Sequence, residues 1–461
     1  MEKLTTTLSS QTVSEIEKDF QPDAHSYRWN TAKKDTLGDV IGLTTADMDF
    51  PRTPQMQQVI VNFAEKGCLM YPTQHPKLNP VTLRRIHNRY KASNIESEDI
   101  LFFPSVLTAM NALVWALNPP NTPYTLLTPN YPPLFNLSQP SKILEMPLLD
   151  TEHEDPTQRG RIDFAKLKTE MHLRQSKVLV ISNPSNPLGK VWQPTEINEI
   201  IDFARKNAIH VLSDEIWIDW TFESPATSFA KFITSPTSNH SAILPVESQS
   251  QPATKSTAAK QPTTSKSCCN ASFDPKKTPA AGISPVEYST SEISDPTVAV
   301  VMATSKTFNI GGLNCAYIIT KNKPLKKKLQ YYLNFYCTAP SQLAQHMLIH
   351  LYEQGDETFH HYKELVRKNR DYLVEFCREK IPQLRLLLGA ASHVVWIDAS
   401  ALTTTASNPA DFFLKNAKVH LFHGSAFGSQ YTKFIRMNIA THPHILAEAL
   451  NRMHQAIKNS H

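Results

Sequence analysis

The sequence of 461 residues lacks long apolar runs, which argues against a membrane-spanning helix. No run of about 18 apolar residues occurs, and the N-terminal stretch has no apolar core of signal-peptide length. Glycine is also scarce, with 12 residues against 33 prolines, so some turns must form without the most permissive residue. We expect a soluble, cytoplasmic protein that has no membrane partner.

A strong charge of either sign is absent as well. The 47 Lys and Arg residues exceed the 42 Asp and Glu residues by a formal charge of only +5, and no dense basic cluster occurs. Nucleic-acid binding is therefore disfavoured. The six cysteines form no C-x-x-C pair, and the adjacent Cys268 and Cys269 do not fit a zinc site. We expect free thiols in a reducing compartment and no metal.

Between about residues 100 and 320, short apolar runs alternate with amphipathic stretches. A segment beginning near Pro194 has the spacing of a helix. The apolar runs predict buried strands, at Tyr124–Leu127, Val178–Ser182, Ile209–Leu212 and Val298–Ala303. Strand, helix and strand in this order predict an α/β fold with a mostly parallel sheet and right-handed crossovers. Ligands of such sheets gather at the carboxyl ends of the strands.

The chain length suits two or three lobes. We expect an N-terminal arm with part of a small domain in residues 1–54, a large domain in 55–330, and a smaller C-terminal α/β domain in 331–461 with one strand at His393–Asp398. Residues 235–295 interrupt the large domain and are rich in Ser, Thr, Pro, Lys and Ala. That composition predicts a disordered insertion, for which an inert surface loop is the simplest interpretation.

Five residues, of which Asn186, Asp214 and Lys306 follow predicted strands, are ordinary when each is taken alone. A lysine is most often a surface charge, an aspartate after a strand a cap, and an arginine in a short strand an edge charge. Together they meet the needs of pyridoxal 5′-phosphate (PLP), which requires an amine, a carboxylate for its pyridine nitrogen, a donor for its phenolic oxygen and an aromatic for its face. The five are Lys306, Asp214, Asn186, Tyr131 and Arg436.

The motifs around these residues resemble fold-type I PLP enzymes of the class I/II aminotransferase superfamily. Within them, the sequence is most similar to the cystathionine β-lyase-like (MalY/PatB) carbon–sulfur lyases. The resemblance runs from His25 to Thr441, outside the insertion. The segments ADMDFP and SKTFNI are specific to that subfamily, whereas NPSNPLG and the Ser-Lys pair belong to the wider fold. The resemblance implies a PLP-dependent transferase fold of type I.

The resemblance also implies roles for single residues. Lys306 is expected to hold the cofactor as a Schiff base and to move the Cα proton of the substrate. Asp214 is expected to pair with the pyridine nitrogen, Asn186 with the phenolic oxygen, and Tyr131 to stack on the ring. Arg436 matches the arginine that grips the substrate α-carboxylate. The cofactor phosphate is expected to contact Ser305, Thr304, and the backbone near Ser105 and Val106.

Some matched positions differ from the family pattern. Serine replaces a glycine at Ser105, and Met70 replaces a glycine before Tyr71. Tyr71 matches the tyrosine that reaches the phosphate across a dimer interface, so a homodimer with shared active sites is expected. Trp217, near the phenolic oxygen, replaces a histidine or tyrosine. Asn314 replaces the phosphate-binding arginine of many aminotransferases, a difference that the lyase subfamily shares.

The resemblance implies a β-lyase that cleaves cysteine S-conjugates, with cystathionine as a candidate, to a thiol, pyruvate and ammonia. Two alternatives stay open. An aminotransferase shares the early steps but needs a keto-acid acceptor, so pyruvate formed without an acceptor indicates the lyase. A PLP-binding regulator of little activity would show the cofactor absorbance without turnover, and the replacements at Ser105, Met70 and Trp217 keep this alternative open.

Overall fold

The structure is a computed structural model in which the insertion predicted at 235–295 lies outside the described residues, except for 293 and 295. The expected disorder of that insertion and the pair Cys268–Cys269 therefore fall outside them too. Described are residues 26–34, 39–66, 69–119, 121–138, 142–234, 293, 295–337, 339–402 and 408–460.

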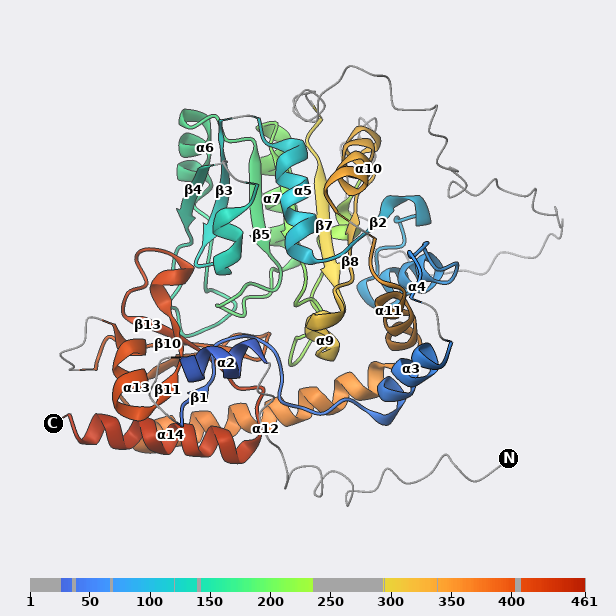
Figure 1. Ribbon diagram of the computed structural model, residues 1–461. Helices are drawn as coiled ribbons and strands as arrows, with labels where there is room; N and C mark the ends of the chain where they lie inside the picture. The colour runs from blue at the N-terminus through green and yellow to red at the C-terminus, as the bar shows by residue number, and fades with distance from the viewer. Residues whose placement is uncertain are drawn as a thin grey trace, which may run out of the picture.

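Seven strands form the larger of the sheets, in the order β2-β8-β7-β6-β5-β3-β4 (Figure 1). From β7 to β4 all neighbours are parallel, and β8 runs antiparallel to β7 and β2. The mostly parallel α/β sheet and the four predicted strands are confirmed. The strands are β2 (Ile100–Phe103), β3 (Pro123–Thr128), β4 (Lys142–Pro147), β5 (Val178–Ser182), β6 (His210–Asp214), β7 (Val298–Ala303) and β8 (Ala316–Ile319).

Helices cover both faces of this sheet because its central strands are apolar on both sides. Val211 of β6 packs in one core cluster with the apolar side of α7, while its neighbour Leu212 packs in another with α5 and α10. The predicted helix at Pro194 is confirmed as α7, with Pro194 at its start. The helices on the two faces include α4 (Leu78–Tyr90), α5 (Val106–Leu117), α6 (Phe164–Leu173), α7 (Pro194–Lys206) and α10 (Lys323–Tyr336).

A second, antiparallel sheet of four strands has the order β12-β13-β10-β9. The single strand predicted beyond residue 330 is β10, and the prediction missed its partners because several have only two or three residues. Arg436 lies in β13, between β12 and β10, so it is not the edge-strand charge that is the ordinary interpretation of an arginine in a short strand. The strands are β9 (Arg385–Leu387), β10 (Val394–Asp398), β12 (Phe422–His423) and β13 (Phe434–Asn438).

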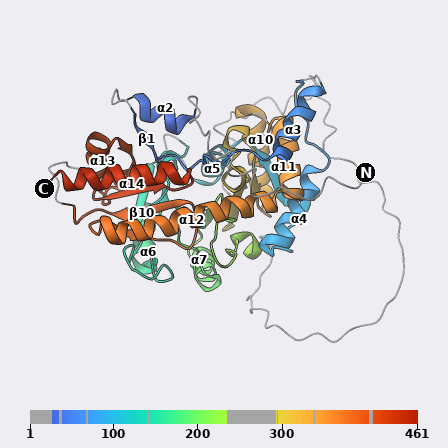
Figure 2. The ribbon, with the colours of Figure 1, turned by 90° about the horizontal axis from the view of Figure 1, so that it is seen from below.

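Near its N-terminus the chain joins the C-terminal lobe, because β1 (Ile41–Gly42) pairs in parallel with β11 (Val419–His420). The long helix α12 (Asp356–Lys380) runs beneath both lobes and beside α14 (Pro443–Lys458) (Figure 2). The domain boundaries at about 54 and 330 stay a prediction. The remaining helices of four or more residues include α2 (Tyr27–Lys34), α3 (Pro54–Glu65), α9 (Ser305–Phe308), α11 (Gln342–Gln354) and α13 (Pro409–Ala417).

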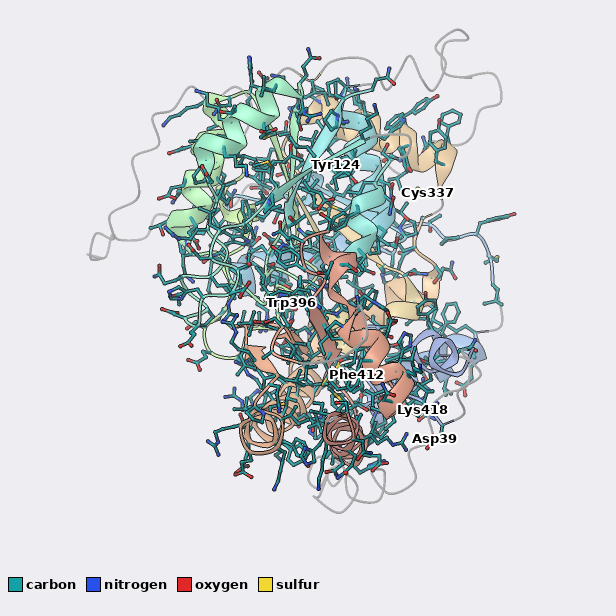
Figure 3. The ribbon with its side chains drawn as sticks, turned by 90° about the vertical axis from the view of Figure 1, so that its left-hand side faces the viewer. Asp39, Tyr124, Cys337, Trp396, Phe412 and Lys418 are labelled. Atoms are coloured by element: carbon teal, nitrogen blue, oxygen red, sulfur yellow. The ribbon has the colours of Figure 1, made fainter. Side chains whose placement is uncertain are left out.

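The two lobes share a continuous apolar core. Trp396 of β10 is fully buried and belongs to the same cluster as Ile181 of β5 and Val211 of β6. Figure 3 shows Trp396 between Tyr124, in the larger lobe, and Phe412, in the smaller one. The ends of the parallel strands are therefore fixed against the C-terminal lobe. Within the described ranges, no helix combines the length and apolarity needed to cross a bilayer.

Candidate active site

A cavity of about 720 Å³ lies where the carboxyl ends of the parallel strands meet the C-terminal lobe. All of the predicted site residues line it except Thr304 and Tyr71. The lining residues come from distant parts of the sequence, from α2 to β13. The cavity lies at the carboxyl ends of the parallel strands, where ligands of such sheets bind. The predicted residues in its lining are Ser105, Val106, Tyr131, Asn186, Asp214, Trp217, Ser305, Lys306 and Arg436.

Asp214 ends β6 and is 4% exposed. One carboxylate oxygen accepts a hydrogen bond from the backbone N–H of Ile216 at 3.1 Å. No ion pair to Asp214 is found within the described part of the chain. Burial raises the pKa of Asp214 to about 6, and the Lys306 charge offsets this only in part. A buried carboxylate at a cavity wall that forms no ion pair with the described side chains is suited to a cationic ligand group.

Lys306 lies in α9, just after β7, and its amine reaches the same cavity. The amine donates a short hydrogen bond to the backbone carbonyl of Ala46 and lies 5.7 Å from the ring centre of Trp217. Burial lowers the pKa of Lys306 to about 8, and the opposing carboxylate of Asp47 only partly offsets burial. A lysine with a lowered pKa is more often neutral, which is the form that attacks a carbonyl carbon.

Arg436 is 1% exposed, and its guanidinium lies 4.9 Å from the ring centres of both Phe422 and Phe427. It donates to the Asn186 side-chain oxygen at 3.1 Å and to the backbone carbonyl of Thr44 at 2.6 Å. Its Nε is buried and has no hydrogen-bond partner among the described residues. Burial lowers the pKa of Arg436 to about 10, so the group stays charged at neutral pH. An unpaired N–H on a buried cation is suited to an anionic ligand such as a carboxylate.

The contact with Arg436 also fixes how Asn186 is turned. Because the Asn186 oxygen accepts from Arg436, its amide nitrogen is the group left to donate. Tyr131 lines the cavity beside these residues, and burial raises its pKa. The phenolic-oxygen and ring-stacking roles expected for Asn186 and Tyr131 stay predictions.

The N-terminus of α5 faces the cavity. Ser105 is its N-cap, and its hydroxyl accepts from the backbone N–H of Thr108 at 3.1 Å. The first N–H groups of a helix have no partner inside the helix, so those of Val106 and Leu107 can bind an anion. The backbone of Ser105 is extended, with φ −153°, so serine causes no strain where the family has glycine.

Thr304 differs from its neighbour Ser305 because it does not line the cavity. Thr304 is buried, and its hydroxyl has no hydrogen-bond partner among the described residues. Tyr71 lies further away, on the segment between α3 and α4, and is 99% exposed, next to Met70 at 70%. Within a single chain the structure therefore does not bring Tyr71 to the other site residues.

Trp217 closes one wall of the cavity and packs edge-on against His393, with ring centres 4.8 Å apart. Nδ1 of His393 donates to the Asn438 side-chain oxygen at 3.0 Å. Burial, reinforced by the Lys306 charge, lowers the pKa of His393 to about 3, so the ring is neutral. The indole of Trp217, which is larger than the histidine or tyrosine of the family, thus packs against the uncharged ring of His393.

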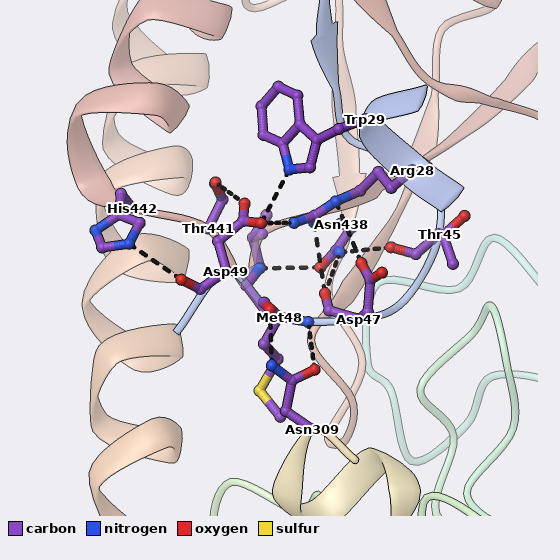
Figure 4. A network of polar contacts seen from close by, with 12 residues as sticks. Arg28, Trp29, Thr45, Asp47, Met48, Asp49, Asn309, Asn438, Thr441 and His442 are labelled. Carbon is purple, nitrogen blue, oxygen red and sulfur yellow. Dashed lines mark hydrogen bonds and ion pairs between the residues drawn. The ribbon is translucent and has the colours of Figure 1, made fainter. Parts of the chain in front are cut away.

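The segment 44–49 is a part of the site whose role the sequence did not reveal, although its motif ADMDFP was noted. Its backbone carbonyl at Ala46 accepts from Lys306, and Asn438 donates to the carbonyls of Thr45 and Asp47 at 2.7 Å each (Figure 4). Arg28 of α2 forms ion pairs with Asp47 and Asp49. Backbone carbonyl groups leave no sequence signal, so only the structure identifies them as site components.

Comparison with known proteins places the chain in a family. The family model for aminotransferase class I and II matches residues 38–253 and 273–453, and the chain belongs to this family. Cystathionine beta-lyase PatB of Bacillus subtilis is 23% identical over 93% of this chain and 96% of its own length. Protein MalY of Escherichia coli is 19% identical over 87% of each chain. The crystal structure of cystalysin from Treponema denticola, which contains PLP, superposes with a TM-score of 0.75 at 21% identity, covering 96% of this chain and 99% of cystalysin.

The cofactor of the protein is pyridoxal 5′-phosphate, as in its family, and the cavity residues fit it. Asp214 offers a buried carboxylate that has no ion pair among the described residues, Lys306 offers an amine of lowered pKa, and the start of α5 offers backbone N–H groups. These are the partners that a protonated pyridine nitrogen, an aldehyde and a phosphate require.

Proposed function

We propose that the protein is a PLP-dependent carbon–sulfur β-lyase that cleaves cysteine S-conjugates to a thiol, pyruvate and ammonia. The observation that carries the proposal is the placement of Lys306, Asp214 and Arg436 around one cavity. The lyase is favoured by the name of the relative PatB, which is a cystathionine beta-lyase, and by Asn314 in the cavity lining, where many aminotransferases have an arginine. Cystathionine is one candidate substrate.

Each residue has a task in this proposal. The bound cofactor supplies an electron sink for the charge that develops when the Cα–H bond breaks. The amine of Lys306 takes the proton from Cα, and Asp214 keeps the pyridine nitrogen protonated. Arg436 binds the α-carboxylate and so fixes which Cα bond faces Lys306. Elimination then forms the Cα=Cβ double bond as the Cβ–S bond breaks, and the thiolate leaves with the electron pair of that bond. Water hydrolyses the released aminoacrylate to pyruvate and ammonia.

We also propose that the active unit is a homodimer in which Tyr71 serves the site of the partner subunit. Tyr71 is almost fully exposed and is preceded by Leu69, at 90%, and Met70, at 70%. Three consecutive large exposed apolar residues are typical of a contact surface. Tyr71→Phe should weaken cofactor binding without changing the sedimentation behaviour or the melting temperature. Wild-type protein that sediments as an active monomer would contradict the dimer.

A product assay tests the activity. Purified protein with PLP and a panel of S-substituted cysteines should release pyruvate, ammonia and one thiol per turnover without a keto acid. The panel should include cystathionine. Pyruvate-free turnover that appears only when a keto acid is added would establish an aminotransferase instead. Cofactor absorbance without turnover on any member of the panel would indicate a regulator.

Arg436→Lys tests the amino-acid substrate class. Loss of the forked guanidinium should lower kcat/KM by about a hundredfold, because charge-assisted bonds to a carboxylate are worth roughly 3 kcal/mol together. The cofactor absorbance should be unchanged. Arg385→Lys is the matched control, because Arg385 also holds a carboxylate, that of Asp398, at 2.8 Å but does not line the cavity. If both variants lose only stability, Arg436 does not bind substrate.

A further inference from the structure

Asp219 is a buried carboxylate outside the cavity, close to the segment that carries Lys306. Its side chain is 3% exposed and forms ion pairs with Arg85, at 3.1 Å, and with Arg89. The hydroxyl of Tyr90 lies 3.3 Å from each carboxylate oxygen. Burial alone would raise the pKa of Asp219, but the two arginines outweigh burial and hold it below its usual value. The carboxylate is therefore ionised and can only accept hydrogen bonds.

Two contacts connect this charge to Lys306. The hydroxyl of Thr307 lies 3.0 Å from Asp219, and it must be the donor because the carboxylate is ionised. The indole N–H of Trp220 donates to the backbone carbonyl of Lys306 at 2.6 Å. Two consecutive residues of one loop thus hold two consecutive residues of α9.

Two further hydrogen bonds hold the residue that follows α9. Asn309 follows α9 in the left-handed conformation, with φ 56°. Its side chain accepts from the backbone N–H of Met48 at 2.9 Å and donates to the Met48 carbonyl at 2.7 Å (Figure 4). The backbone beneath Lys306 is therefore tied both to the loop after β6 and to the segment 44–49.

These contacts to α9 matter because Asp219 and Trp220 lie in the loop that follows Asp214, the last residue of β6. Whatever fixes α9 to this loop also fixes the Lys306 amine relative to the Asp214 carboxylate, across the cavity. A displacement of about 1 Å between reacting groups can cost roughly a hundredfold in rate. Arg85 also pairs with Asp356 at 2.9 Å, at the start of α12, so the anchor is itself tied to the helix beneath both lobes.

We propose that Asp219, acting through Thr307 and together with Trp220, is a positioning residue that sets where the Lys306 amine stands relative to Asp214. The inference rests on the proposed function, since it concerns the lysine of that reaction. The charged cluster around Asp219 lies outside the cavity that holds cofactor and substrate. If the cluster only stabilised the fold, its loss would not change the properties of Lys306.

Thr307→Val tests this inference because it removes the donor while the ion pairs of Asp219 remain. We expect kcat to fall about tenfold to a hundredfold with KM little changed. The pH titration of the cofactor absorbance should shift by about one unit, because it reports the charges around the lysine. Thr307→Ser, which keeps the hydroxyl, should restore both. Trp220→Phe should act in the same direction, and it serves as the test if Thr307→Val does not fold.

Thr125→Val is the matched control. The Thr125 hydroxyl is fully buried, lies 2.7 Å from Ser176 Oγ, and is remote from the cavity. It should lower the melting temperature without moving the titration. If Thr307→Val or Trp220→Phe behaves like Thr125→Val, the positioning role is wrong while the proposed function stands. A wild-type protein that acquires no cofactor absorbance would overturn the proposed function and this inference together.

Discussion

Two buried aspartates, Asp214 at the end of β6 and Asp219 in the loop that follows, have opposite surroundings. Asp214 faces the cavity and has no ion pair within the described residues, and burial raises its pKa to about 6. Asp219 does not line this cavity, and Arg85 and Arg89 hold its pKa below the usual value against the effect of burial. The chain supplies cations to the carboxylate that anchors structure and leaves the other for a ligand. Both carboxylates are buried, so burial does not distinguish them. The absence of an ion pair among the described residues is what identifies the carboxylate that faces a ligand.

The largest effect is expected at the lysine that faces Asp214. Lys306→Ala should abolish turnover and the yellow cofactor absorbance, since no other amine in the described lining reaches the cavity. Lys190→Ala is the control, because Lys190 is also buried but is paired with Glu196 at 2.7 Å. Absorbance and kcat measured on both variants should separate them. Activity retained in Lys306→Ala would show that Lys306 is not the catalytic amine.

Asp214→Asn should lower kcat by about a hundredfold or more, because the pyridine nitrogen loses the anion that keeps it protonated. The apoprotein should lose no stability, since the change removes a buried charge that lacks a cation. Steady-state kinetics and urea unfolding of the apoprotein check the two halves. A near wild-type rate would show that Asp214 faces some other group.

Asp219→Asn, unlike Asp214→Asn, should lower the stability of the folded protein. It leaves two arginines without their shared carboxylate, which should cost roughly 3 kcal/mol or more of unfolding free energy. Asp356→Asn removes the other, 73% exposed, partner of Arg85 and should cost less than about 1 kcal/mol. Urea unfolding measures both. Equal losses for the two variants would remove the distinction between the buried anchor and an exposed pair.

The smallest effect is a pH dependence of apoprotein stability. The folded pKa of Asp214, about 6, lies above the ordinary aspartate value of 3.8, so the folded state binds this proton more tightly. Its contribution is present at low pH and is lost as pH rises towards 6. The lowered pKa of Asp219 acts oppositely, with stability lost only as pH falls below the ordinary range. Asp214→Asn should flatten the stability profile between pH 3.8 and 6, and an unchanged slope in thermal melts would contradict this.

The fold was largely predictable because buried parallel strands leave short, continuous apolar runs, as at Val178–Ser182 and Val298–Ala303. The small sheet was not, since strands such as Phe422–His423 are too short to show a pattern, and only pairing places Arg436 inside that sheet. Nothing local in the sequence gives that pairing.

The candidate site divides in the same way. Side chains at strand ends, such as Asp214 and Lys306, could be named from sequence because PLP demands their chemistry. The carbonyl of Ala46 and the anchor at Asp219 could not, because one is backbone and the other acts through tertiary contacts. Tyr71 was predicted at the site but is exposed in the single chain, since a contribution across subunits depends on assembly.

The most direct test of the central claim is to identify the residue that carries the cofactor. Purified protein saturated with PLP is reduced with borohydride, digested and analysed by peptide mass spectrometry. We expect the phosphopyridoxyl group to lie on Lys306, in the peptide that contains SKTFNI, and on no other buried lysine such as Lys190 or Lys328. Reduction that leaves Lys306 unmodified, or that labels a different lysine stoichiometrically, would contradict it.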